Sequence, residues 1–264
     1  MKITALVENI TKSDFKARHG LSLYIETHHH KILFDLGPDK TVFENAKKRS
    51  IDLSNIDIVI ISHGHIDHGG ALEQFLKVNS KAKIYLQKKA FEPHYSKTLF
   101  LKIPVGINGK IKNHSQIILL DGDHVIDNEL RLITVQKTDR CYSPLNDALY
   151  NDEGIDDFSH EQHLIISENS VALITGCGHS GIVNIMDQSN TDNPKSCIGG
   201  FHLYNPITKR SVSKKLLDAL AAELQIYPQT KFYTCHCTGL KAFQYLSERL
   251  PNLAYLFCGD SIYI

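Results

Sequence analysis

Four side chains that can bind metal ions lie in one short segment, Ser62-His63-Gly64-His65-Ile66-Asp67-His68-Gly69-Gly70. His63 and His65 stand two residues apart, and in an extended chain this spacing places both imidazoles on one side, where they can share an ion. Asp67 and His68 are adjacent, so they point in different directions and can reach a second ion. The segment therefore predicts two divalent metal ions that activate water or polarise an oxygen-rich substrate. Zinc is the expected metal, with Mn or Fe as alternatives.

Four local side chains cannot complete two coordination spheres, because zinc takes about four ligands and a catalytic site keeps one position for water. Three further histidines follow predicted strands in glycine-rich contexts: His179 in GCGHSG, His202 in GGFHL and His236 in TCHCTG. We expect His179 and His236 to be metal ligands. For His202 three interpretations stay open: a metal ligand, a substrate contact, or a turn histidine held by backbone hydrogen bonds.

The elements that must position these side chains are strands. IDIVIIS, residues 56–62, is a continuous apolar run typical of a strand buried on both faces, and the metal-binding segment follows it directly. In doubly covered sheets, ligands gather beyond the carboxyl ends of strands. Further strands are predicted at 2–8, 21–26, 31–35, 83–87, 117–120 and 130–135, as a hairpin at 163–175, and in KSCIGGFHL, KFYTCHCTG and LAYLFCGD. Helices are predicted near 38–48, 70–78, 181–188, 208–224 and 239–249.

The simplest packing of these elements is two sheets face to face with helices outside, an α/β (α+β) sandwich in a single domain over residues 1–264. Residues 88–160 are rich in turns, and SPLNDALYNDEGIDDF, residues 143–158, predicts a long loop of the kind that is often functional. We expect His94 and Tyr95 to be exposed polar residues, and His160 and His163 to be ordinary surface histidines.

Other polar groups near the predicted ligands are weaker candidates. Strand alternation is expected to turn Cys235 and Cys237 away from the side that His236 faces, as buried structural thiols. Cys177 precedes His179 by two residues, which gives it a weaker claim to line the site. The backbone amides of 180–181, at the start of a predicted helix, suit a phosphate group.

Composition argues against several classes of protein. Lys plus Arg number 29 and Asp plus Glu number 29, so the chain has no basic surplus for nucleic acid or a membrane surface. A small anionic molecule is the expected partner, and the oligomeric state stays open. Six cysteines without a CxxC pair, in a chain without a recognisable secretory leader, are expected to be free thiols of a cytoplasmic protein.

The sequence resembles the metallo-β-lactamase superfamily. The resemblance rests on His63-Gly64-His65-Ile66-Asp67-His68 as the HxHxDH signature, Asp35-Leu36-Gly37 as the early aspartate motif, and His179 and His236 as the third and last histidines. It implies a four-layer αββα sandwich with a dinuclear site at one edge, between the sheets. One departure is that Gly199-Gly200-Phe201-His202 stands where the superfamily usually has an aspartate that bridges the metals.

The resemblance also implies roles for the ligands. His63, His65 and His179 are expected to hold the first ion, and Asp67, His68 and His236 the second. Asp67 is further expected to orient the attacking water or to shuttle a proton. Asp35 is expected to accept the free N–H of a ligand histidine and so fix its tautomer, with a strand-end turn residue as the alternative.

The motifs GCGHSGIVN, GGFHL and TCHCTG are similar to a subgroup that includes the archaeal dihydropterin-methyl-ribofuranosylaminobenzene-phosphate synthase. Two functions therefore stay open. The first is a metal-dependent hydrolase that uses activated water on a small ester- or phosphate-containing substrate. The alternative is a transferase that joins a dihydropterin to a phosphorylated ribosyl-arylamine. A redox iron protein is less favoured, because flavin-linked di-iron relatives carry Glu at the position of His65.

Overall fold

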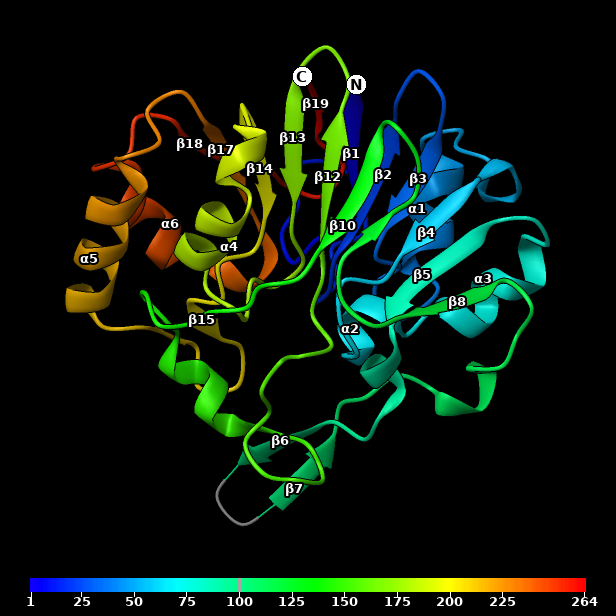
Figure 1. The fold of residues 1–264 in the computed structure, drawn as a ribbon, viewed down its shortest axis with the longest axis horizontal. Helices are drawn as coiled ribbons and strands as arrows, with labels where there is room; N and C mark the ends of the chain where they lie inside the picture. Colours follow the sequence, from blue (N-terminus) through cyan, green and yellow to red (C-terminus); the bar gives the residue numbers. More distant parts are fainter. Residues whose placement is uncertain (99–100) are drawn as a thin grey trace.

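Two β-sheets pack face to face, and helices cover the outer face of each sheet, which gives four layers (Figure 1). The computed structural model describes residues 1–98 and 101–264. The first sheet consists of β19 (Ser261–Tyr263), β1 (Lys2–Val7), β2 (Ser22–Glu26), β3 (Lys31–Phe34), β4 (Ile58–Ile60), β5 (Lys83–Gln87) and β8 (Ile117–Leu120), in this spatial order. The second consists of β18 (Leu253–Tyr255), β17 (Lys231–Thr234), β14 (Ser196–Gly199), β13 (Val171–Ile174), β12 (His163–Ser167), β10 (Leu130–Ile133) and β9 (His124–Val125).

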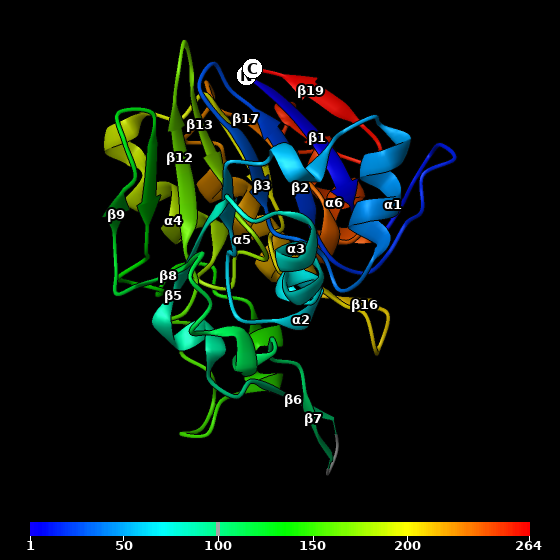
Figure 2. The ribbon, with the colours of Figure 1, turned by 90° about the vertical axis from the view of Figure 1, so that its right-hand side faces the viewer.

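The helices form the two outer layers. Figure 2 looks onto the first sheet from its helical side, with α1 and α3 in front of the strands. The α-helices are α1 (Thr41–Lys48), α2 (Ile66–Gly69), α3 (Leu72–Val78), α4 (Ile182–Gln188), α5 (Lys214–Leu224) and α6 (Leu240–Ser247). The 3-10 helices are η1 (Leu53–Asn55), η2 (Lys88–Phe91), η3 (Gly109–Ile111), η4 (Pro144–Ala148), η5 (Asn190–Asp192) and η6 (His236–Thr238). No helix in the described ranges combines the length and the apolar character that crossing a bilayer requires.

Two small sheets complete the fold. One joins β6 (Tyr95–Thr98), β7 (Leu101–Pro104) and β11 (Leu149–Tyr150), and the other joins β15 (Tyr204–Asn205) and β16 (Arg210–Ser211). The β6–β7 hairpin extends beyond one end of the sandwich, on the side opposite the two chain termini (Figure 1).

Side-chain alternation explains the layers. In β3, Ile32 and Phe34 lie in the core between the two sheets, whereas Leu33 between them packs into the core under α1 and α3. In β12, Leu164 likewise enters the inter-sheet core, and Ile165 faces the core beneath α4 and α5. Because successive side chains of a strand point to opposite faces, a central strand must be apolar throughout to bury both faces.

Parallel pairing places the functional loops at one edge. β3, β4 and β5 pair in parallel in the first sheet, and β13, β14, β17 and β18 do so in the second. The carboxyl ends of parallel strands lie together, so the loops that follow β3, β4, β13, β14 and β17 can meet at this edge. The predicted αββα sandwich is thus confirmed.

Several predicted boundaries were wrong. The helix expected over 208–224 begins only at Lys214, because β16 (Arg210–Ser211) pairs with β15 first. The strand β19 was not predicted. It pairs with β1 and forms one edge of the first sheet. The turn-rich stretch 88–160 contains the β6–β7 hairpin, which was not predicted because its strands are only four residues long and β7 is exposed.

Candidate metal centre

Three buried histidines converge at the edge between the sheets. Ligand atoms of His63, His65 and His179 all lie within 4.8 Å of one another. The Nε2 atom of each is buried and has no hydrogen-bond partner among the described residues. Buried polar nitrogens are rarely left without a partner, so three that face one another fit a cation that is shared between them.

The chain fixes the tautomer of His63 through Asp35. Ser62 Oγ donates to Asp35 Oδ2 (2.7 Å) and therefore accepts the proton of His63 Nδ1, 2.8 Å away. Asp35 Oδ2 also lies 2.6 Å from His68 Nδ1. His63 thus keeps its proton on Nδ1 and turns a free Nε2 toward the site, whereas His68 carries a proton on Nδ1 and its Nε2 faces Cys177 Sγ at 3.2 Å. Asp35 thus contacts His68, one of the predicted ligands, and its role in fixing a metal ligand stays a prediction.

His179 and His236 are held by matching contacts from two asparagines. Asn146 Oδ1 accepts from His179 Nδ1 (2.9 Å), and its Nδ2 donates to the carbonyl of the same histidine (2.9 Å). Asn9 holds His236 in the same way, at 2.9 and 3.1 Å. Each arrangement leaves Nε2 free for a ligand role.

Two glutamates fix the backbone at the same histidines. Glu161 accepts from the amides of His179 (2.8 Å) and Ser180 (2.7 Å), and Glu8 accepts from the amide of His236 (2.8 Å). Sequence reasoning missed these residues, because no local spacing connects Glu8 or Asn9 with a histidine more than 200 positions away. Of the amides of 180–181, which were expected to suit phosphate, that of Ser180 donates to Glu161 and that of Gly181 donates to the carbonyl of Gly178.

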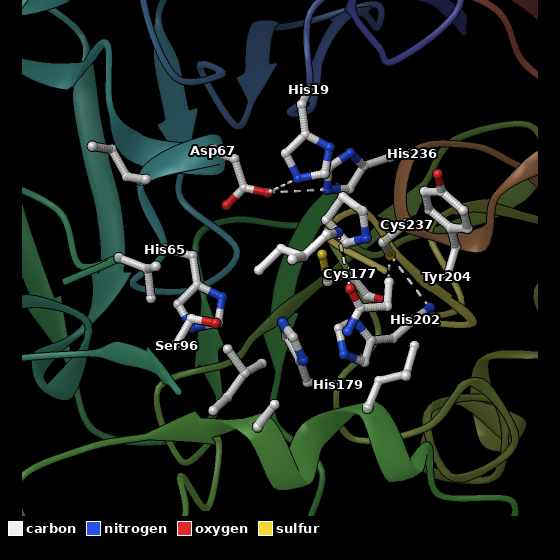
Figure 3. Close-up of a pocket in the computed structure, with 18 of the residues that line it drawn as sticks. His19, His65, Asp67, Ser96, Cys177, His179, His202, Tyr204, His236 and Cys237 are labelled. Atoms are coloured by element: carbon white, nitrogen blue, oxygen red, sulfur yellow. Dashed lines mark hydrogen bonds and ion pairs between the residues drawn. The ribbon is translucent and has the colours of Figure 1, made fainter. Parts of the chain in front are cut away.

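Asp67 faces the second group of ligands. Its Oδ2 lies 3.3 Å from His236 Nε2 and 3.8 Å from His68 Nε2. His19, which the sequence did not suggest, approaches the same oxygen at 3.4 Å (Figure 3). The residues predicted for the second ion are therefore brought together, although their binding of metal stays a prediction.

Three of these positions have a left-handed backbone without being glycine. Asp35, His202 and His236 have φ values of 60°, 48° and 49°. Such conformations are uncommon outside glycine and cluster at functional sites. Each residue follows a strand, β3, β14 or β17, and the sharp turn aims its side chain back across the edge of the sandwich.

The centre leaves no room for a side chain at two glycines. A Cβ at Gly176 would lie 2.1 Å from Ser62 Oγ, and one at Gly64 would lie 2.4 Å from the carbonyl oxygen of Ala90. The glycines beside the histidines therefore allow segments from both sheets to approach closely.

Cys177, His202 and Cys237 lie between the two ligand groups (Figure 3). Cys177 Sγ is 3.2 Å from His68 Nε2. His202, an open question from the sequence, has both ring nitrogens buried without a hydrogen-bond partner in the described part of the chain. The expectation that Cys237 turns away from His236 was wrong, since both line the same pocket. The reason is that β17 ends at Thr234 and η6 replaces strand alternation; Cys235 does enter the inter-sheet core.

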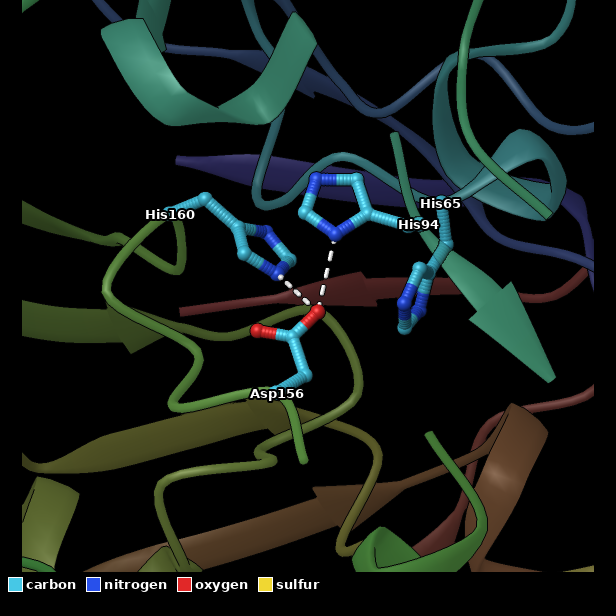
Figure 4. Close-up of side chains that lie close together, drawn as sticks. All are labelled: His65, His94, Asp156 and His160. Carbon is cyan, nitrogen blue, oxygen red and sulfur yellow. Dashed lines mark hydrogen bonds and ion pairs between the residues drawn. The ribbon is translucent and has the colours of Figure 1, made fainter. Parts of the chain in front are cut away.

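A second polar cluster, formed by His94, Asp156 and His160, lies beside His65 (Figure 4). Asp156 Oδ2 lies 2.8 Å from His94 Nδ1 and 3.2 Å from His160 Nε2. His160 Nδ1 accepts from the amide of Gly64 (3.0 Å), which fixes the loop between His63 and His65. The expectation that His94, His160 and His163 are exposed was wrong: all are buried, with His163 bonded to Thr175.

The electrostatics of the site separate His68 from its neighbours. Burial lowers the pKa of His63, His65 and His179 well below 6.5, and the neighbouring imidazoles lower it further. Burial acts in the same direction on His68, but the carboxylates of Asp35 and Asp67 outweigh it and raise the pKa of His68 to about 9. Neutral imidazole is the form that binds metal.

The cluster opens into a pocket of about 260 Å³ (Figure 3). Its walls beyond the histidines are mainly apolar and come from α2, the β6–β7 hairpin with the residue after it, η4 with β11, and the turn at β15: Ile66, Ile103, Val105, Leu145, Ala148, Leu149, Tyr204, Pro206 and Ile207. Among the described residues that line it there is no Lys or Arg. The 143–158 segment, which was predicted to be a long loop, contains η4 and β11 and supplies part of this wall.

Comparisons with known proteins agree with this geometry. Residues 16–136 match the sequence model of the metallo-beta-lactamase superfamily. The crystal structure of Tm1679, a metal-dependent hydrolase of the beta-lactamase superfamily, superposes with a TM-score of 0.83 at 24% identity, covering 100% of this chain and 99% of that one. The match, the signature and the fold make this chain similar to the metallo-β-lactamase superfamily.

Two relatives come from Methanocaldococcus jannaschii. An uncharacterized protein is 27% identical over 265 residues, which cover 98% of this chain and 99% of the relative. The 7,8-dihydropterin-6-methyl-4-(beta-D-ribofuranosyl)-aminobenzene-5'-phosphate synthase is 27% identical over 281 residues, which cover 96% of this chain and 92% of the relative. The similarity to this synthase that the sequence motifs suggested is confirmed.

Replacing Asp35 with Asn should weaken metal binding by about 10–100-fold, the usual effect of losing a residue that orients ligands. Asn tolerates the left-handed backbone at this position, so the fold should be preserved. Its NH2 group must face either the amide of Ser62 or the pair Ser62 Oγ and His68 Nδ1, however, so Asn cannot keep all three contacts that orient the histidines. Competition with a chromogenic chelator measures the affinity. Asp121→Asn, an exposed carboxylate, is the matched control, and equal affinities for the two variants would contradict the role assigned to Asp35.

Removing metal should make the fold less stable in acid. The folded-state pKa values of His63, His65 and His179 lie well below the ordinary 6.5, so the unfolded chain binds more protons. The stabilising contribution of the three neutral imidazoles is complete above pH 6.5. Below it, the free energy of unfolding falls by about 1.4 kcal/mol per pH unit for each proton that the unfolded chain takes up. His68 acts in the opposite sense: its contribution is present below pH 6.5 and is lost as pH rises through about 9.

Urea unfolding of chelator-treated protein measures this dependence. The free energy of unfolding should be highest near neutral pH, fall steeply toward pH ~5, and fall less steeply toward pH ~10, because three imidazoles act in acid and one in alkali. Stability that is higher at pH ~5 than at neutrality would show that these nitrogens are not held neutral in the folded state.

Proposed function

We propose that this protein is a zinc-dependent hydrolase of carboxylic esters, thioesters or lactones that carry an apolar body. The observation that carries the proposal is the convergence of the unpaired Nε2 atoms of His63, His65 and His179 beside Asp67, at the bottom of an apolar pocket. Imidazoles with carboxylate favour zinc over the harder cations, which prefer oxygen ligands.

The donor set fits two ions. His63, His65 and His179 would hold the first, and Asp67, His68 and His236 would hold the second. Divalent metal held in this way supplies Lewis acidity and lowers the pKa of water toward neutrality. The remaining tasks fall to side chains of this chain: orienting the substrate, excluding bulk water and moving a proton.

Asp67 is the residue placed to move that proton. Burial would raise its pKa, but His68, His236 and His19 outweigh this effect and hold the pKa well below 3.8, so the carboxylate is ionised at neutral pH. All three histidine contacts go to Oδ2. Oδ1 can therefore accept a proton from the nucleophile and return it to the leaving group.

The pocket favours a particular class of substrate. Aliphatic side chains such as Ile103, Leu145 and Ile207 can bury the apolar part of a small substrate while its reacting group lies at the histidines. A phosphate ester needs cationic side chains or free backbone amides, yet the described lining has no Lys or Arg, and Glu161 occupies the amides of 179–180. A carboxylic ester, whose only charge develops at the metal end during reaction, fits this lining better.

A second function is favoured by one observation, the 27% identity to the dihydropterin synthase over 96% of this chain. In that case the chain would join a dihydropterin to a phosphorylated ribosyl-arylamine, and the metals would bind substrate oxygens. The apolar walls suit a flat heterocycle, but the described lining offers no cationic partner for the phosphate of the arylamine.

A substrate panel tests the proposal. Zinc-loaded protein should hydrolyse aryl esters, thioesters or lactones with apolar acyl groups, lose the activity on chelation, and regain it with zinc. Asp67→Asn should lower kcat by about 10²–10⁴-fold, the usual contribution of a positioned general base. Asp147→Asn, an exposed carboxylate on η4, should keep wild-type kcat and serves as the matched control.

Three outcomes would contradict the proposal. Cleavage of phosphoesters alone would overturn the substrate class while keeping the hydrolase. Condensation of a dihydropterin with a phosphorylated arylamine, with no ester cleaved, would establish the transferase. Equal kcat for Asp67→Asn and Asp147→Asn would remove Asp67 from its role in proton transfer.

A further inference from the structure

The sulfur of Cys177 lies in the middle of the ligand cluster. Its Sγ lies within 4.8 Å of candidate ligand atoms on His63, His68, His179, His202, His236 and Cys237. Its contact with His68 Nε2 is 3.2 Å long. Because the cluster comprises the first ligand group as well as the second, this single atom is within reach of both metal positions.

The surrounding nitrogens point to a ligand in the same space. The Nε2 atoms of His63 and His179 are buried and have no hydrogen-bond partner in residues 1–98 and 101–264, and the buried Nε2 of His236 has Asp67 Oδ2 3.3 Å away. These side chains are almost fully buried, so no bulk water satisfies them. These nitrogens surround the Cys177 sulfur, and a cation that binds them could also bind a thiolate.

Charge supports the same conclusion. Two divalent cations bring four positive charges, whereas Asp67 is the one carboxylate in the described lining of the pocket. The segment Gly199-Gly200-Phe201-His202, at the end of β14, offers no acid. A thiolate at the centre would supply negative charge where none comes from β14, and sulfur is a ligand that zinc binds well.

We propose that Cys177 would hold metal through Sγ, within reach of both ligand groups, and would supply the negative charge that a carboxylate would otherwise supply there. When the bond forms, the thiol proton leaves to solvent and the sulfur electron pair is donated to the metal, so no oxidant or reductant is required. The inference rests on the proposed metal centre but not on the proposed substrate.

Cys237 is a positioning residue for this ligand. Its Sγ donates to the carbonyl oxygen of Cys177 (3.2 Å) and accepts from the amide of His202 (3.3 Å). Gly200 leaves room for it, since a Cβ there would lie 2.4 Å from the Cys237 sulfur. With both contacts made to backbone, Cys237 fixes the turns that carry Cys177 and His202.

Cobalt substitution of the full-length protein tests the assignment without relying on activity. Wild-type protein loaded with Co(II) should show a near-ultraviolet sulfur-to-cobalt charge-transfer band. Cys177→Ala should lose this band and bind less cobalt per chain. Cys197→Ala, a buried thiol in the core under α4 and α5, is the matched control and should keep the band. Cys237→Ala should keep it as well, with weaker cobalt affinity.

A band that persists in Cys177→Ala but disappears in Cys237→Ala would overturn the assignment. X-ray absorption on zinc-loaded wild-type protein gives an answer even if a variant fails to fold, because a sulfur scatterer at about 2.3 Å is expected. Metal bound with nitrogen and oxygen neighbours alone would overturn the inference and leave the metal centre intact. No metal binding in wild type would overturn both.

Discussion

Buried imidazole nitrogens without protein partners are the constraint on which the rest of the structure depends. His63, His65 and His179 turn Nε2 toward one another, although burial makes both protonation and an unpaired nitrogen costly. A divalent cation removes this cost, because it accepts all three lone pairs at once. Without one, the neutral imidazoles have nothing to coordinate, and acid would force protons onto them.

The fold holds these nitrogens in place with separate devices on each sheet. In the first sheet, Asp35 at the end of β3 fixes His68 directly and His63 through Ser62. In the second, Asn146 fixes His179 and Asn9 fixes His236, each by a pair of hydrogen bonds. Asn9 follows β1 in the first sheet, and its partner His236 follows β17 in the second. These hydrogen bonds therefore connect the two sheets, and the geometry of the site depends on how the sheets pack.

The sequence predicted the parts of this arrangement that have a local signature. The spacing of His63, His65, Asp67 and His68 identified the metal segment, and continuous apolar runs identified strands buried on both faces, because these features depend on neighbours in the chain. The resemblance to the superfamily supplied His179, His236 and the layered sandwich. The resemblance also supplied Asp35, which follows β3, a strand parallel to the β4 that precedes the motif.

What the sequence could not predict depends on contacts between distant segments. Asn9, His19 and Asn146 have no spacing relation to the histidines they approach, and His94 and His160 looked like surface residues because their partner, Asp156, lies in a loop. Cys237 was misplaced because strand alternation was extended past Thr234, where η6 begins. The apolar pocket could not be predicted either, since its walls come from segments that lie far apart in the sequence: α2, the β6–β7 hairpin, η4 with β11, and the turn at β15.

The central claim is that the histidine nitrogens at this edge of the sandwich bind metal. Crystals of the protein grown with zinc, with anomalous diffraction recorded on both sides of the zinc absorption edge, test this claim most directly. The account predicts a strong anomalous peak at about 2.0–2.1 Å from Nε2 of His63, His65 and His179. Zinc found only at surface histidines, with these three nitrogens bonded to water or to one another, would contradict it.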